Sequence, residues 1–311
     1  MMVAFVCVLF TLPLYTPGFL LDIINRIGIA IIGAVGLNIL TGFTGQISLG
    51  NAAFMAIGAF SCGFLSTKFN VPFYLCIPLA GLITAACGMF VGIPSLRIKG
   101  LYLAMATLAA HFIVEFLIVK WESVTGGVDG MSIPAPALGS YELDTDARLF
   151  FLIFVIVVLA VLFATNLFRT KVGKAFVAIR DQAISAEVMG VNILKYKLLS
   201  FGISSFYIGV AGALIAYQAR LISPETFPVS LAIDYLGMII IGGLGSILGS
   251  IFGAIFIKLL PELLRMVTTS LSGSYPDLIY KLASMKELVF GILVITFLIF
   301  EPNGLASRWH R

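Results

Sequence analysis

Long, uninterrupted apolar runs dominate the chain, and they predict helices that span a membrane. Residues Leu149–Ala164 are all apolar, and Leu288–Phe300 contains a single hydroxyl residue and no charge. In lipid, backbone groups must find their hydrogen bonds within a helix or a closed barrel. Strands of a membrane barrel would alternate polar and apolar residues, which these runs do not. The pattern therefore predicts an all-α integral membrane protein, a polytopic helical bundle.

The lengths of the runs predict about ten transmembrane helices in one membrane domain covering residues 1–311. A spanning helix needs about 20 apolar residues. The candidate spans are 2–17, 26–41, 50–67, 73–94, 100–119, 148–167, 198–217, 233–246, 247–264 and 286–301. Glycines interrupt Tyr235–Leu264, which is too long for one upright span, so we expect broken or re-entrant helices there. The first run lacks a basic leader and a cleavage site, and we interpret it as a helix.

The amino-acid composition also indicates a membrane protein, and its cysteines and histidines do not suggest a metal site. The chain is 60% hydrophobic and 11% charged, whereas soluble chains average about a quarter charged residues. Its mean hydropathy is +1.10. The four cysteines lie in or beside apolar segments without C-x-x-C spacing, and the two histidines lie far apart. We therefore expect membrane-core cysteines and no metal site.

The distribution of charge predicts the orientation. The loop at about 168–197 is basic, and the loop at about 120–148 is acidic. Because Lys and Arg accumulate in cytoplasmic loops, the first loop should be cytoplasmic and the second external. Arg308 and Arg311 favour a cytoplasmic C-terminus, and ten spans then place the N-terminus there as well.

One apolar stretch, Gly36–Phe60, is rich in polar residues and glycines. Polar side chains are costly in lipid and usually face a bundle interior or a cavity. Leu236–Phe256 is a weak echo of this stretch, and transporters often place broken helices at corresponding positions around the pathway. The candidate pathway residues are Asn38, Thr41, Gly45, Gln46, Ser48, Asn51, Gly242, Gly243 and Gly245. The alternative is that these residues only pack and hydrogen-bond between helices.

The basic loop contains a predicted amphipathic helix, Ala175–Met189, which Gly190 is placed to end. A long, charged and structured cytoplasmic loop favours docking to another protein. The alternative is a helix lying in the membrane interface. Asp181 and Glu187 fit poorly with an anionic lipid surface, so docking is the preferred interpretation.

The acidic loop contains a glycine-rich turn, TGGVDG, at Thr125–Gly130. Gly126, Gly127 and Gly130 form a tight backbone shape that displays Asp129. From spacing alone, an ordinary loop turn is the preferred interpretation.

Motifs of soluble enzymes are absent. Gly173 and Lys174 are followed by Ala175 without an upstream glycine, so there is no P-loop, and neither H-E-x-x-H nor G-x-S-x-G occurs. His111 and Glu115 lie one helical turn apart and share a face of a predicted span. Ionisable residues within a membrane span can relay protons. A proton-coupled secondary transporter is therefore an alternative function, though a less favoured one.

Taken in order, these stretches resemble the branched-chain amino acid ABC permease family, in its LivM-type branch. The matching runs cover roughly residues 30–301. They are GLNILTGFTGQISLGNAAF at 36–54, GLYLAMATLA at 100–109, TGGVDG at 125–130, AIRDQAISAEVMGVNILKYKLLSF at 178–201, AGALIA at 211–216, SPETF at 223–227 and IGGLGSILG at 241–249. Such an ordered series is far more specific than any single glycine motif.

The resemblance implies a transport subunit in the bacterial inner membrane that is not itself an enzyme. The implied partners are a LivH-type permease, two cytoplasmic ATPases that bind ATP and Mg, and a periplasmic amino-acid-binding protein. The chain itself would hold no cofactor and contact no nucleic acid. The implied ATPase contact comprises Arg180, Asp181, Ala186, Glu187 and Gly190, and the implied external gate or binding-protein contact comprises Thr125, Gly126, Gly127, Asp129 and Gly130.

The chain departs from the family pattern at several positions. Gln182 and Ala183 follow the Arg180–Asp181 pair, where family members often continue with acidic residues. Val188 replaces the second alanine of the E-A-A…G docking pattern, and Asn51 stands where many relatives carry histidine. Substrate identity resides largely in the binding protein. Related permeases for urea, short amides or simple sugars therefore stay as alternatives to leucine, isoleucine and valine.

Overall fold

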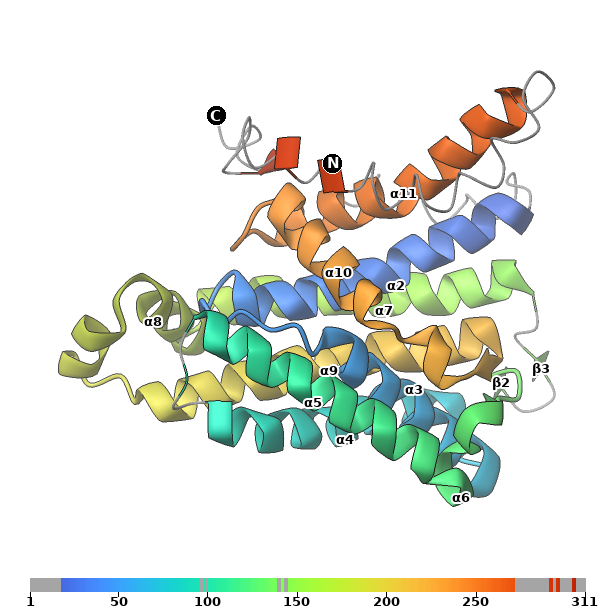
Figure 1. The fold of residues 1–311 in the computed structure, drawn as a ribbon, viewed down its shortest axis with the longest axis horizontal. Coiled ribbons are helices and arrows are strands. Elements are labelled where there is room, and N and C mark those ends of the chain that lie inside the picture. Colours follow the sequence, from blue (N-terminus) through green and yellow to red (C-terminus); the bar gives the residue numbers. More distant parts are fainter. Residues whose placement is uncertain are drawn as a thin grey trace.

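The computed structural model describes residues 18–95, 98, 100–138, 141–142, 145–271, 291–292, 295–296 and 304–305. Over these residues the chain is an elongated bundle of α-helices (Figure 1). The helices are α2 (Gly18–Thr41), α3 (Asn51–Lys68), α4 (Phe73–Ser95), α5 (Leu101–Lys120), α6 (Glu122–Thr125), α7 (Asp146–Arg169), α8 (Lys171–Val188), α9 (Ile193–Ala219), α10 (Val229–Gly242) and α11 (Ile247–Leu271).

Short connecting elements gather at one end of the bundle. They are the 3-10 turns η2 (Gly127–Asp129) and η3 (Pro224–Thr226) and the two-residue strands β1 (Met131–Ser132), β2 (Ala137–Leu138), β3 (Tyr141–Glu142) and β4 (Leu221–Ile222). Antiparallel pairing of β1 with β4 places Met131 opposite Ile222, and β2 pairs with β3. Helix α8 lies at the opposite end of the bundle (Figure 1). The two loops predicted on opposite sides of a membrane therefore lie at opposite ends.

Helices α2 and α9 form the centre. Their most apolar windows are 78% and 72% buried, whereas those of α5 and α7 are only 28% and 22% buried. Helix α9 packs against α2, α3 and α4, and the α10–α11 hairpin packs on α2. An apolar helix with most of its surface outside the bundle needs lipid or another subunit around it. Within the described part of the chain, six segments are long and apolar enough to cross a membrane: Gly18–Thr41, Phe73–Pro94, Leu101–Lys120, Asp146–Arg169, Ile193–Ala219 and Pro224–Gly242.

Several predicted boundaries differ from those of the structure. Helix α2 begins at Gly18 rather than at residue 26, because two neighbouring charges neutralise each other: Arg26 Nε lies 2.9 Å from Asp22 Oδ2. The segment Tyr235–Leu264 is broken as predicted, and its second helix begins at Ile247 as predicted, but its first helix ends at Gly242 rather than at residue 246. The predicted span 2–17 lies outside the described residues, and 286–301 lies mostly outside them. The described helices therefore do not establish the count of ten.

Candidate functional site

The break between α2 and α3 is a largely buried, hydrogen-bonded segment, residues 42–50, in which Gly45 and Ile47 are exposed. The Thr41 hydroxyl donates to the Gln46 carbonyl oxygen (3.1 Å), and Gln46 Nε2 donates to Ser200 Oγ on α9 (2.8 Å). The Leu49 amide donates to Thr107 Oγ1 on α5 (2.9 Å). These side chains hold three helices around the break. Their assignment to the translocation path stays a prediction.

The second break, between α10 and α11, meets the first through Asn38. Asn38 Oδ1 accepts a hydrogen bond from the Gly245 amide (2.9 Å), and its Nδ2 donates to the Ser246 carbonyl oxygen (2.8 Å) and to Ser250 Oγ (2.7 Å). Asn38 is 1% exposed. One buried amide therefore joins two glycine breaks that lie about 200 residues apart in sequence, and both breaks belong to the predicted pathway set.

Arg180 of α8 contacts both breaks. Its Nη1 donates to the Gly42 carbonyl oxygen (3.0 Å). A Cβ added to Gly45 would lie 3.2 Å from Arg180 Cγ, and one added to Gly245 would lie 2.6 Å from Nη1. Both glycines have positive φ, 72° and 77°. The structure thus brings Arg180, predicted only as an ATPase contact, together with Gly45 and Gly245.

Other predicted pathway residues have different surroundings. Ser48 Oγ accepts a hydrogen bond from the Gly50 amide (3.3 Å), and Gly242 and Gly243 close the end of α10. Asn51 is fully buried, and neither of its side-chain polar atoms has a hydrogen-bond partner among the described residues. Three hydrogen-bonding partners, Thr107, Ser200 and Ser250, were not predicted. Their only signal is a hydroxyl in an otherwise apolar run.

Helix α8 differs from the predicted continuous helix Ala175–Met189. It begins at Lys171, and Gln182 interrupts it with non-helical angles (φ −158°, ψ 95°). The first half is anchored, because Phe176 and Ile179 are 0% and 4% exposed. Asp181, just before the kink, is exposed, and in the second half Ala186 is buried and Glu187 is exposed. Gly190 follows the helix with φ +86°, as expected for a residue that ends it.

Beyond the kink, α8 presents apolar side chains to solvent. Ile184, Val188 and Met189 are 75%, 84% and 85% exposed. Helix α8 lies at one end of the bundle (Figure 1). Adjacent large apolar residues this exposed are typical of a protein interaction site.

The glycine-rich turn at the opposite end caps α5. The Thr125 hydroxyl lies 2.6 Å from the Ile118 carbonyl oxygen, to which it donates, and Gly126, Gly127 and Gly130 all have positive φ. Asp129 is exposed. Gly130 approaches the β4 backbone so closely that an added Cβ would lie 2.2 Å from the Ile222 carbonyl oxygen. Contact of this turn with a binding protein stays a prediction. No group of three metal-ligating side chains occurs in the part of the chain that the structure describes.

Comparison with known proteins places the chain in a family. A family model described as "Branched-chain amino acid transport system / permease component" matches residues 19–298. The high-affinity branched-chain amino acid transport system permease proteins LivM of Salmonella typhimurium and Escherichia coli are each 30% identical over 308 residues, which is 91% of this chain and 69% of theirs.

More distant relatives have related names. The probable branched-chain amino acid transport permease protein LivH of Methanocaldococcus jannaschii is 24% identical, over 88% of this chain and 87% of its own length. No solved structure gives a significant match. The helical bundle and these matches together show that the chain is a multi-pass membrane protein of the branched-chain amino acid transport system permease family.

Proposed function

We propose that the chain is a channel-forming subunit of an ATP-driven importer that moves leucine, isoleucine and valine into the cytoplasm. The 30% identity to two LivM permeases over nearly the whole chain supports the substrate class. The observation that carries the mechanism is Arg180, which joins the protruding helix α8 to both glycine breaks. In this proposal the chain contributes part of the translocation route for the amino acid, and partner subunits hydrolyse ATP.

We infer that the second half of α8 docks on a cytoplasmic ATPase, which binds ATP and Mg. Ile184, Val188 and Met189 offer an apolar contact beside the exposed Glu187 carboxylate. The kink at Gln182 separates this contact from the half that Phe176 anchors. A movement of the docked half of α8 would displace Arg180, which is hydrogen-bonded to the Gly42 carbonyl oxygen. The movement would thereby act on the first glycine break.

The remaining assignments follow from this orientation. The α8 end faces the cytoplasm of a bacterial inner membrane, both termini are cytoplasmic, and the α6–β3 end receives a periplasmic binding protein. A second permease, LivH-type, covers the apolar helices that this chain leaves outside its core. The LivH-named relative supports a paired arrangement of this kind.

Uptake by the purified complex tests this function. The complex of both permeases and two ATPases is reconstituted in vesicles, with ATP on the ATPase side and the binding protein on the other. We expect ATP-dependent uptake of labelled leucine that unlabelled isoleucine and valine inhibit and that urea and ribose do not. Uptake inhibited by urea or ribose instead would assign the chain to a different solute.

A further inference from the structure

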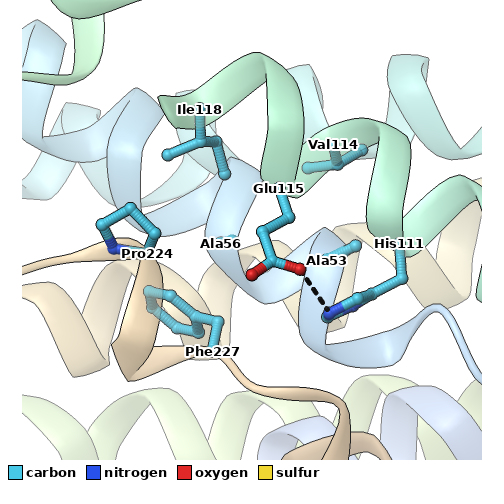
Figure 2. Close-up of a pocket in the computed structure, with 8 residues that line it drawn as sticks. All are labelled: Ala53, Ala56, His111, Val114, Glu115, Ile118, Pro224 and Phe227. Carbon is cyan, nitrogen blue, oxygen red and sulfur yellow. Dashed lines mark ion pairs between the residues drawn. The ribbon is translucent and has the colours of Figure 1, made fainter. Parts of the chain in front are cut away.

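A small pocket near the outer end of α5 contains a pair of ionisable side chains that the coupling mechanism does not use. Figure 2 shows His111 and Glu115 of α5 directed toward each other, with Ala53 of α3 and Phe227 across the pocket. His111 Nε2 lies 3.9 Å from Glu115 Oε2, too far for a direct hydrogen bond. The pair therefore keeps hydrogen-bonding capacity for a third group.

The His111 side chain is buried, whereas the Glu115 side chain is accessible from outside the chain. The His111 side chain is 2% exposed and that of Glu115 is 50% exposed. Neither ring nitrogen of His111 has a hydrogen-bond partner among the described residues. A buried imidazole without partners is unfavourable unless a ligand or water occupies the site. The carboxylate is therefore the solvent-accessible member of the pair.

Glu115 lies within the span rather than at its end. It lies five residues before the end of α5 at Lys120, about 7 Å along the helix axis. Its neighbours Phe112 and Phe116 are 55% and 61% exposed, so this face is otherwise apolar. Ionisable residues within a span normally face a bundle interior or a water-filled cavity. This face of α5 therefore borders an aqueous route or another subunit.

The size and walls of the pocket restrict its ligand. The cavity measures about 10 Å³, room for about one water-sized group. A whole leucine does not fit, but a primary ammonium group has this size, carries three donors and complements a carboxylate. Val114 and Ile118 supply apolar surface beside it.

We propose that His111 and Glu115 form a transit site for the ammonium group of the amino acid, on the outer half of the translocation route. The Glu115 carboxylate binds the ammonium group, and the neutral His111 imidazole accepts one of its hydrogens. The proposal rests on the proposed function, because it assumes that α5 borders the route for an amino acid.

A charge-sensitive accessibility experiment tests the site. In the assembled complex with Cys7, Cys62, Cys76 and Cys87 replaced by alanine, Val114→Cys is exposed to two membrane-impermeant thiol reagents, one cationic and one anionic. We expect the cationic reagent to react faster and Glu115→Gln to slow it by about threefold, as Coulomb attraction to one nearby charge in water predicts. Leucine should protect the thiol, and 4-methylpentanoate, which lacks the ammonium group, should not.

Transport by the same complexes supplies the second readout. Glu115→Gln should lower leucine uptake by about tenfold, as loss of one charge-assisted hydrogen bond predicts. The matched control Glu262→Gln, which removes a partly exposed carboxylate of α11, should leave uptake unchanged. An unreactive thiol in the Val114→Cys variant, equal rates with both reagents, or separation of the two permeases in Glu115→Gln would each overturn the proposal. If the parent complex does not transport leucine, the proposed function fails instead.

Discussion

At the scale of single residues, two polar side chains connect the helices near the α8 end of the bundle. Asn38 satisfies one amide, one carbonyl and one hydroxyl of the second break, and Arg180 covers the carbonyl of the first. Each buried polar group left without its partner costs about 1–3 kcal/mol. We therefore expect replacement of Asn38 to lower the stability of the subunit, and replacement of Arg180 to lower the coupling between ATP hydrolysis and uptake.

Replacing Asn38 should mainly reduce stability. Asn38→Leu removes three hydrogen bonds and leaves their partners in the second break and on α11 unpaired, so the free energy of unfolding should fall by about 2–4 kcal/mol. Asn38→Asp keeps the acceptor for the Gly245 amide but buries a carboxylate against the Ser246 carbonyl oxygen, so it should not restore stability. Thermal unfolding of the purified subunit in detergent measures both. Unchanged melting of Asn38→Leu would contradict the assigned hydrogen bonds.

Replacing Arg180 should mainly reduce coupling. Its side chain is 37% exposed, so its removal should change melting little, but Arg180→Ala breaks the link from α8 to Gly42. We expect the complex to assemble and hydrolyse ATP while leucine uptake falls by about tenfold or more. Arg180→Lys keeps the charge without the planar fork and should restore uptake only partly. If Arg180→Ala kept the parent ratio of leucine uptake to ATP hydrolysis, the contact between Arg180 and Gly42 would have no role in coupling.

At the scale of elements, helix α8 joins an anchored half to a protruding half. The sequence predicted a helix here and its termination by Gly190, because apolar spacing and a terminal glycine are local signals. It did not predict the kink, since Gln182 is neither glycine nor proline. Nor could a single sequence show that Arg180 lies on Gly42, because pairing between distant helices leaves no local pattern.

The protruding half of α8 provides an element-scale prediction. Val188→Asp places a charge in the proposed apolar contact and should reduce co-purification of the ATPases with the membrane subunits. Val128→Asp is a matched control, because Val128 is 69% exposed at the opposite end of the bundle. We expect the control to retain the ATPases. Equal retention by both variants would remove α8 from the docking surface.

At the scale of the whole molecule, the sequence predicted the helical bundle, the broken segment at Gly242–Gly245 and the separation of the two charged loops. Apolar runs and glycines carry that information directly. Predicted ends were less accurate where charges pair inside a helix, as Asp22 and Arg26 do in α2. The meeting of the two breaks depends on packing over about 200 residues, which hydropathy does not encode.

The sidedness of α8 tests the central claim most directly. The single-cysteine variants Lys171→Cys in α8 and Asp129→Cys in the glycine-rich turn, each in the cysteine-free background, can be labelled with an impermeant reagent in intact cells and in inverted membrane vesicles. We expect the Lys171→Cys thiol to react only in inverted vesicles and the Asp129→Cys thiol only in intact cells. Reaction of the Lys171→Cys variant in intact cells would place α8 outside, where no ATP-hydrolysing partner could reach it.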